Sequence, residues 1–311
     1  MSPTPWLHDI AELDPPSPSS SVSSLDEEEV NSRLKPYWHK YTPLLKHRGF
    51  RLDTVHDVKE HYRMCNLDFP RNPRRSIDDD ALCPDPGLPD NLFRGARIVD
   101  GMKVMVKAVS LWSREFDIIR FLSSPTMRAQ SMNHCIPVLD LVQVPEDDTA
   151  FIVMEEWSSQ LIPDSGPCSL KLFLEAIRQC IEHAAFMHAH HIAHLDISLR
   201  NLVTDYKGHY AYIDFELSRR FKEPNVQLCG YYRGTEVPPE CEERKSNDPY
   251  KIDVWALAIL ILRACKASCP MVYDLLSLNL SRSFSSQDTV FLNWLNWSSQ
   301  CFTKTQTNAP L

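Results

Sequence analysis

The sequence predicts an α+β fold, with short strands in the middle of the chain and long helices after them. Residues 93–99 and 103–109 have the composition of two strands, and the Asp100-Gly101 pair between them is a strong signal for a hairpin turn. Apolar residues then recur at helical spacing over 169–191: Leu170, Phe173, Leu174, Ile177, Ile181, Ala184 and Ala185. A second apolar helical run begins at Asp253. Strands followed by helices are typical of the α+β class.

The charge of the chain argues against some classes of partner. Its 33 Lys and Arg residues against 41 Asp and Glu residues leave a formal net charge of −8. A surface that binds nucleic acid or an anionic membrane carries an excess of positive charge. We therefore expect neither of these as the main partner of the chain.

The cysteines and the apolar runs indicate the compartment. Ten cysteines show no framework of pairs, and the nearest pair, Cys265 and Cys269, matches no common zinc spacing. The N-terminus has no basic region leading into an apolar core, and the longest apolar run, 254–262, is far shorter than the ~20 residues that span a bilayer. We expect an intracellular protein of the cytoplasm or nucleus without a membrane span.

The first 90 residues differ in composition from the rest. Residues 1–29 are rich in Pro and Ser and end in four acidic residues, a composition that buries too little apolar area to offset ordering, so they are predicted to be disordered. Residues 30–90 are predicted to be an N-terminal extension and linker. The helix-like part of it should pack on the main domain through apolar residues at near-helical spacing: Leu34, Tyr37, Trp38, Tyr41, Leu44, Leu45 and Phe50.

The linker itself is predicted over 69–90. It contains five prolines and the acidic residues 78–80, as a solvated connection does. The basic run ending at Ser76 is also typical of a phosphorylation site, but we favour a solvated linker.

Between the predicted hairpin and the long helix lie a short helix and two strands. Residues 115–122 have apolar positions at helical spacing, and residues 138–144 and 150–154 are apolar runs of strand length. Lys107 lies in the second strand of the hairpin, among apolar neighbours. Its ordinary explanation is a sheet-edge lysine whose stem covers apolar surface.

Residues 194–216 carry the chemistry around which the rest of the chain is organised. Asp196 and Asn201 precede a predicted hairpin, and Asp214 follows it. A hairpin brings its two ends together, so two carboxylates and one amide should meet at one place. Such a set of oxygen ligands suits Mg²⁺ and can hold it with a triphosphate beside a base.

The spacing resembles the catalytic and metal-binding loops of protein kinases, H-R-D-x-x-x-x-N followed by D-F-G. The chain has Leu195 in place of the Arg and Glu216 in place of the Gly. Residues 234–240 resemble the end of a kinase activation segment, and Asp253 resembles the residue that anchors the catalytic loop from a buried helix. The N-terminal extension and residues 133–140 are similar to a divergent group of fungal protein-kinase-like proteins.

The resemblance implies a bilobal protein-kinase-like fold. A small β-rich N-lobe with the hinge would cover residues 91–157, and a mainly helical, shortened C-lobe would cover residues 158–311. It also implies that the chain binds ATP with Mg²⁺ and transfers the γ-phosphate to the hydroxyl of a protein substrate, whose identity the sequence leaves open.

The resemblance implies catalytic roles for three residues. Asp196 would accept the proton of the substrate hydroxyl, and Lys107 would hold the phosphates of ATP. Glu115, with Asp117 as the alternative, would pair with Lys107 and orient it.

ATP and the metal would be bound by further residues of the same pattern. Asn201 and Asp214 would be the Mg²⁺ ligands. The main chain of Glu155 and of Trp157 would meet the adenine edge, and Met154 would stand behind it.

Departures from the pattern favour two alternatives. No G-x-G-x-x-G precedes the Lys107 strand, so the backbone cradle for phosphates is absent or built differently. Together with Leu195 and Glu216, this favours a pseudokinase, a binding module in which catalysis has decayed. A small-molecule kinase of the aminoglycoside or choline type is the third hypothesis, because residues 213–216 read Ile-Asp-Phe-Glu as they often do there.

Histidines crowd the end of the long predicted helix and invite a metal hypothesis. Their spacing matches no known metal motif, and His188 and His194 fall where protein kinases have histidines of their own. We therefore interpret them as structural.

Overall fold

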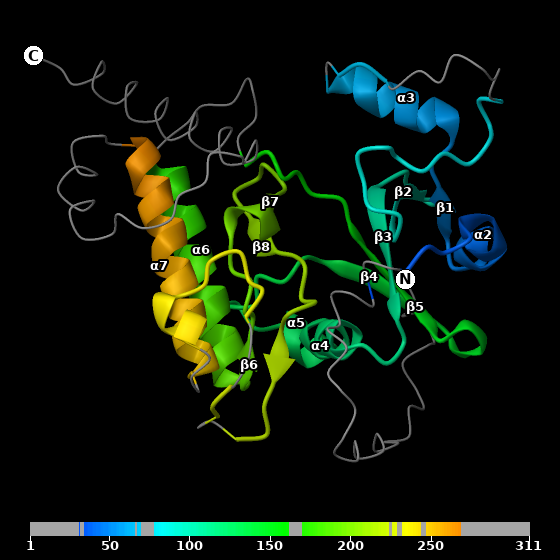
Figure 1. Ribbon diagram of the computed structural model, residues 1–311. Helices are drawn as coiled ribbons and strands as arrows, with labels where there is room; N and C mark the ends of the chain where they lie inside the picture. The colour runs from blue at the N-terminus through cyan, green and yellow to red at the C-terminus, as the bar shows by residue number, and fades with distance from the viewer. Residues whose placement is uncertain are drawn as a thin grey trace, which may run out of the picture.

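The protein is described here by a computed structural model (Figure 1). The structure describes residues 31, 34–65, 67–69, 78–161, 170–223, 226–228, 232–243 and 247–268. The predicted disordered tail, 1–29, and the chain beyond residue 268 lie outside the described residues. Among the helices that are described, none combines the length and apolarity needed to cross a membrane.

A five-stranded antiparallel sheet forms one part of the molecule. The predicted hairpin is confirmed, with Leu92 opposite Lys107 and Phe93 opposite Val106. In spatial order the strands are β1 (Phe50–Leu52), β2 (Leu92–Arg97), β3 (Lys103–Ser110), β5 (Thr149–Glu155) and β4 (Val138–Val144). Because β1 belongs to this sheet, the boundary expected at residue 90 does not separate the extension from the strand-rich part.

The outer face of the sheet is covered by the N-terminal extension. Helix α2 (Trp38–His47) buries Trp38, Tyr41 and Leu45. The Trp38 ring lies 5.1 Å from the ring of Phe93 on β2, as an edge-to-face aromatic contact. The predicted packing of this segment on the main domain is confirmed. Phe50, expected on the same helix, lies instead on β1.

A connection of unusual length joins β1 to β2. It begins with helix α3 (Val55–Met64), whose N-terminus is closed by a capping box between Thr54 and Asp57. Figure 1 shows α3 standing apart from the sheet. The adjacent strands β1 and β2 are therefore not joined by a short turn.

The opposite face of the sheet carries α4 (Arg114–Leu122), as the sequence predicts. The helix begins where the Ser113 hydroxyl accepts a hydrogen bond from Phe116 N at 3.2 Å. Phe116, Ile119 and Leu122 are buried in the largest core of the molecule. A single turn, α5 (Pro125–Arg128), follows.

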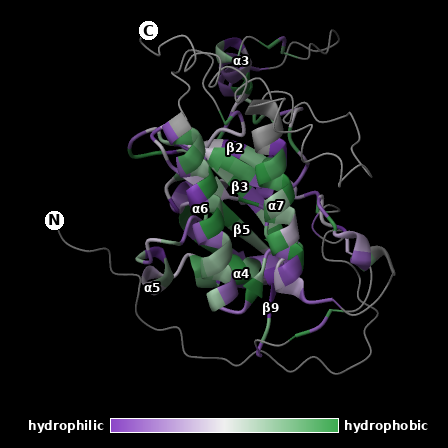
Figure 2. Ribbon diagram, turned by 90° about the vertical axis from the view of Figure 1, so that its left-hand side faces the viewer, coloured by the Kyte–Doolittle hydropathy of each residue, from purple (hydrophilic) through white to green (hydrophobic). Residues whose placement is uncertain are grey.

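Two long helices form the second part of the molecule. Helices α6 (Leu170–Ala189) and α7 (Pro249–Ser268) run side by side in Figures 1 and 2, and both carry green, apolar stretches in Figure 2. Small strands and 3₁₀ turns complete this part: β6 (Ile192–Ala193), β7 (Leu202–Thr204), β8 (Tyr210–Tyr212), β9 (Arg219–Arg220), and turns at Leu199–Asn201 and Pro239–Glu243. A further 3₁₀ turn, Pro145–Asp147, joins β4 to β5 in the sheet.

The apolar stripe predicted for α6 is only partly buried. Phe173 and Ala184 lie in the core as expected, but Leu174 and Ile181 are exposed. The buried face also contains four apolar residues that the expected stripe does not include: Ala176, Cys180, Phe186 and Met187. The helical period is therefore right, and the buried face is rotated relative to the predicted one.

Gly95 allows β1 to approach β2 closely. A Cβ atom at this position would lie 2.4 Å from the carbonyl oxygen of Arg51 on β1. We expect Gly95→Ala to lower the free energy of unfolding by about 1–3 kcal/mol, as overpacking does. The measurement is the urea midpoint.

Gly101→Asn is the control for this variant. Nothing lies within 4 Å of a Cβ at Gly101, and its φ of +72° is one that Asn tolerates. A midpoint for Gly95→Ala equal to that of the control would contradict the close approach of the two strands.

Candidate active site

The loop that follows β6 is anchored to α7 by hydrogen bonds to Asp253. This residue of α7 is 1 % exposed, and its carboxylate accepts hydrogen bonds from the backbone N–H groups of His194 and Leu195, both at 2.7 Å. His188 Nε2 lies 2.9 Å from the same carboxylate. The anchoring role predicted for Asp253 is confirmed, and it holds Leu195 in the left-handed region at φ +64°.

Asp196 and Asn201 lie together at the end of this loop. Asn201 Nδ2 donates to the Asp196 carbonyl oxygen at 3.0 Å and to Asp196 Oδ2 at 2.7 Å. The other carboxylate oxygen of Asp196 accepts from Thr235 N at 2.6 Å. The Asp196 carboxylate is thus fixed in orientation, while the residue stays partly exposed.

Gly234 brings the segment that contains Thr235 onto the loop. A Cβ at Gly234 would lie 2.3 Å from the Leu195 carbonyl oxygen, so a side chain does not fit there. Residues 234–240, which resemble the end of an activation segment, therefore contact the loop through its backbone.

Lys107 is buried among three carboxylates. Its Nζ lies 2.8 Å from Glu115 Oε1, 3.0 Å from Asp214 Oδ1 and 2.8 Å from Glu216 Oε1. Burial lowers the pKa of Lys107, but the three carboxylates outweigh it and raise that pKa well above its usual value. Lys107 therefore stays charged and joins β3, α4 and the loop after β8.

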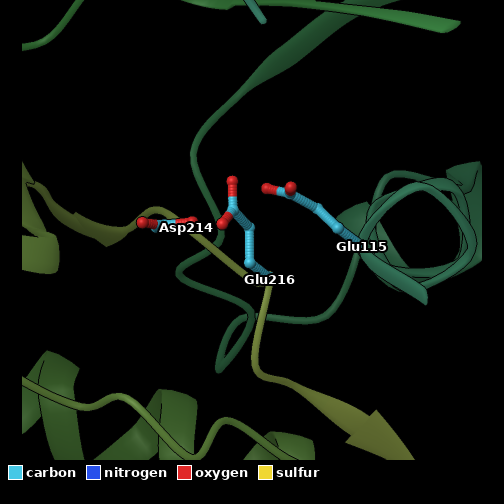
Figure 3. Close-up of side chains that lie close together, drawn as sticks. All are labelled: Glu115, Asp214 and Glu216. Carbon is cyan, nitrogen blue, oxygen red and sulfur yellow. The ribbon is translucent and has the colours of Figure 1, made fainter. Parts of the chain in front are cut away.

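The three acidic side chains converge from two elements, as Figure 3 shows. Glu115 comes from α4, and Asp214 and Glu216 come from the loop after β8, where Asp214 has φ +64°. Burial raises the pKa of Glu115 to about 7, with Lys107 opposing the shift. Burial also raises the pKa of Glu216. Against the effect of burial, Lys107 lowers the pKa of Asp214. Three carboxylates surround one ammonium group, which leaves the cluster with a formal charge of −2.

This excess of negative charge fits a divalent cation. One oxygen from each of Glu115, Asp214 and Glu216 lies within 4.8 Å of the others, the one such group of metal-ligating side chains in the described part of the chain. Hard oxygen donors are the ligands that Mg²⁺ prefers. No histidine belongs to this group.

The residues expected beside adenine are Glu155, the last residue of β5, and Trp157 in the segment that follows it. Glu155 N donates to the Pro137 carbonyl oxygen at 3.0 Å, and Trp157 Nε1 donates to Glu155 Oε2 at 2.9 Å. Ser158 and Thr204 exchange backbone hydrogen bonds, both at 2.9 Å, which ties this segment to β7. Met154 lies on β5 opposite Met105 of β3.

Sequence reasoning missed Arg94, which shares a sheet face with Lys107. Arg94 lies opposite Met105, two residues before Lys107, so all three side chains are on the same face. Its guanidinium is ion-paired with Asp85, at 2.7 Å, and with Glu156. A charged residue within a strand was the available signal, as it was at Lys107.

Asp85 connects this ion pair to the segment between β1 and β2. Its carboxylate accepts hydrogen bonds from the Tyr62 hydroxyl and from Gly87 N, both at 2.8 Å. Arg94 thus joins the long β1–β2 connection, β2 and the segment after β5.

Leu195 is part of an apolar cluster in the helical part. It is buried with Ala193, Cys241 and Ile252. At the position where the kinase pattern has an arginine, this chain therefore has a leucine that packs in an apolar cluster.

The chain belongs to the protein kinase domain family. The sequence model of that family matches residues 96–292. This range includes the candidate site residues Lys107, Glu115, Asp196, Asn201 and Asp214.

Several kinases are similar to it at low identity. Serine/threonine-protein kinase oca2 of Schizosaccharomyces pombe is 27% identical over 49% of this chain and 24% of its own length. Sperm motility kinase Z of Mus musculus is 25% identical over 57% of this chain and 36% of its own length. Serine/threonine-protein kinase pim-2 of Danio rerio is 24% identical over 59% of this chain and 66% of its own length. The chain thus spans less than two thirds of the length of each of these relatives.

The histidines near the loop are packed as core residues. His183 is buried, stacks on Tyr212 with ring centroids 5.2 Å apart, and accepts a hydrogen bond from His134 N at 3.1 Å through Nδ1. Its Nε2 is buried without a hydrogen-bond partner. Burial lowers the pKa of His183 well below its usual value.

His183 should therefore make stability depend on pH. The folded state resists its protonation, so the free energy of unfolding falls as pH drops below ~6.5, by up to about 1.4 kcal/mol per pH unit. We expect His183→Asn, which retains an acceptor for His134 N, to reduce the slope of urea stability against pH between 6.5 and 5. His56→Asn, at an exposed position, is the control. An unchanged slope in His183→Asn would assign the acid sensitivity to other groups.

Proposed function

We propose that the chain is an ATP-dependent protein kinase that transfers the γ-phosphate of ATP to a hydroxyl of a protein substrate. The observation that carries the proposal is the buried Lys107–Glu115 pair, which also contacts Asp214. By similarity to the serine/threonine kinases above, the acceptor is a serine or threonine.

The proposed mechanism assigns one role to each residue. ATP would supply the γ-phosphoryl group and leave as ADP, and Mg²⁺ would neutralise the charge of the phosphates. Lys107 positions the α- and β-phosphates, and Glu115 orients Lys107. Asp196, with one oxygen held by Asn201, accepts the proton of the substrate hydroxyl through its carboxylate.

The remaining assignments concern binding of the nucleotide and the metal. Asp214 and Asn201 are the proposed Mg²⁺ ligands, and Glu216 and Glu115 lie close enough to Asp214 to add to the set. The main chain of Glu155 and Trp157 is proposed to meet the adenine edge.

The second candidate is a pseudokinase of the kind found in divergent fungal kinase-like proteins. Two observations favour it. Glu216 forms an ion pair with the Lys107 ammonium group and would compete with the phosphates of ATP for it. The Arg94–Glu156 ion pair reaches from the Lys107 face of the sheet to the segment proposed to bind adenine. Both groups would have to share space with a bound nucleotide.

Turnover and binding distinguish the two candidates. We expect Asp196→Asn to lower phosphotransfer to a protein acceptor by 10²–10⁴-fold, the range for loss of a general base. The same variant should keep its thermal stabilisation by Mg-ATP. Lys107→Met and Asp214→Asn should lose that stabilisation, which is about 2.7 kcal/mol at a hundredfold excess of ligand over Kd.

Lys59→Met, at an exposed position on α3, is the control for these variants. If Mg-ATP stabilises the unaltered chain but no phosphotransfer is measured, the kinase proposal is contradicted and the pseudokinase is supported. Equal stabilisation of the unaltered chain, Lys107→Met and Asp214→Asn would contradict the site itself.

Glu216 gives a separate test of the charge balance. Removing the Glu216 carboxylate leaves the Lys107 ammonium group with one fewer ion-pair partner. It also removes a negative charge from beside the phosphates. At ~6 Å and an effective dielectric of about 20, one charge pair is worth roughly 3 kcal/mol, and solvent reduces this to ~1 kcal/mol. We expect Glu216→Gly to tighten Mg-ATP binding by several-fold to about a hundredfold.

Glu216→Gln keeps the size of the side chain and should act in the same direction. Calorimetric titration with Mg-ATP measures both variants. Weaker binding in both would mean that Glu216 is a metal ligand.

A further inference from the structure

One face of the five-stranded sheet carries several basic residues. Side chains of directly paired residues on neighbouring strands lie on the same face of a sheet. Arg94 shares the face of Lys107, and so does Ala96, two residues further along β2. Ala96 pairs with Arg51 on β1 and with Lys103 on β3. The face on which the phosphates of ATP are proposed to bind therefore has four basic residues: Arg51, Arg94, Lys103 and Lys107.

The β1–β2 connection supplies acidic partners to this face. Arg51 Nη1 lies 2.6 Å from Asp57 Oδ2, and Lys103 Nζ lies 3.4 Å from Asp53 Oδ2. The connection precedes β2 and β3, where the kinase pattern has its glycine-rich loop over the phosphates. A carboxylate offers a cation the same kind of charged oxygen as a phosphate. The aspartates of the connection therefore bind to groups that phosphates could otherwise contact.

Arg94 is held between the connection and the segment after β5. Its Nε lies 2.7 Å from Asp85 Oδ2, and the same guanidinium is ion-paired with Glu156. The side chain of Asp85 is only 3 % exposed and is fixed by hydrogen bonds from the Tyr62 hydroxyl and from Gly87 N. Both acidic partners of Arg94 are thus fixed to separate segments, and Arg94 joins the two.

The Arg94–Glu156 ion pair crosses the sheet on the Lys107 face. Strand β3 lies between β2 and β5, and Glu156 follows β5 directly. Arg94 lies opposite Met105 of β3, and Met105 lies opposite Met154 of β5. The ion pair must therefore pass over β3 close to Met105. A nucleotide that contacts both Lys107 and the segment proposed to meet adenine has to cross the same part of the face.

We propose that the β1–β2 connection is an intramolecular cover of the nucleotide face, and that Mg-ATP binds when the contacts of Arg94 with Asp85 and Glu156 open. The cover rests on the proposed function, since it requires that the Lys107 face binds the nucleotide. In the closed state, carboxylates of the chain itself neutralise the basic residues of this face. The measured affinity for Mg-ATP is then that of the open state multiplied by the fraction of molecules that are open.

The closed state is tested without nucleotide, by hydrogen exchange of the Gly87 and Leu88 amides in the full chain. Gly87 N donates to the Asp85 carboxylate at 2.8 Å, and Leu88 N donates to the Asp85 carbonyl oxygen at 3.0 Å. The double variant Asp85→Asn, Arg94→Met removes the ion pair without leaving Asp85 charged and unpaired. We expect it to speed exchange at both amides at least tenfold.

The effect on the nucleotide is measured by calorimetric titration with Mg-ATP. The double variant should bind Mg-ATP at least tenfold more tightly than the unaltered chain. Glu156→Ala, which keeps the Asp85–Arg94 pair, should also bind it more tightly. Mg-ATP should speed exchange of the Gly87 and Leu88 amides in the unaltered chain, because a ligand that binds the open state increases its population.

Arg97→Met is the matched control. Arg97 lies on the same strand as Arg94 but on the other face, and it pairs with Asp100 in the turn of the hairpin. The control should leave both the exchange and the affinity unchanged. Thermal melting followed by circular dichroism shows that each variant is folded.

Three results would overturn the proposal. Weaker Mg-ATP binding in the double variant would make Arg94 a nucleotide ligand. Unchanged affinity in the double variant and in Glu156→Ala would show that the connection does not cover the site. Slower exchange of the Gly87 and Leu88 amides on addition of Mg-ATP would show that the connection closes on the nucleotide.

Failure of the proposed function gives a different pattern. The exchange at Gly87 and Leu88 would then be faster in the double variant, but neither the unaltered chain nor any variant would bind Mg-ATP. If only the cover is wrong, the unaltered chain binds Mg-ATP, Lys107→Met does not, and the double variant binds no more tightly than the unaltered chain.

Discussion

A buried charge at Lys107 is the constraint on which the arrangement of the strand-rich part depends. An ammonium group in a core is tolerated only with close partners, because loss of one partner of a buried pair costs about 3–5 kcal/mol. Its carboxylate partners come from α4 and from the loop after β8. Sheet, helix and loop must therefore meet at one point, or the lysine would be unpaired.

Asp253 performs the corresponding task for the helical part. Its carboxylate is held by α7 and binds two consecutive N–H groups of the loop that contains Asp196. This compensates the left-handed conformation of Leu195, which a leucine adopts at a cost of about 1–3 kcal/mol. Two buried ionisable residues, Lys107 and Asp253, thus position the two halves of the candidate site.

Much of this arrangement could be predicted because its signals are local. The hairpin β2–β3 follows from Asp100-Gly101, and β7–β8 from two short apolar runs around a turn. Strand β1 could not be predicted in this way. Its three residues are too few to show a strand period, and they follow directly on a helical pattern.

The contacts that sequence reasoning missed join distant segments. Arg94 reaches Asp85 and Glu156, and Asn31 reaches Glu115, 84 positions away. Neither partner is marked by spacing, since each depends on where the β1–β2 connection and the N-terminal extension lie. The residue types were visible in the sequence, but the geometry that pairs them was not.

The long connection between β1 and β2 has a consequence for the order of folding. Bringing the ends of 53–91 together costs about 3 kcal/mol in chain entropy beyond a constant term, whereas the β1–β2 pairing joins only three residue pairs. The burial of Trp38 and Tyr41 of α2 supplies the rest of the attraction. We therefore expect strand β1 and α2 to join the sheet as one late cooperative unit, after β2, β3, β5 and β4 have assembled through their shorter connections.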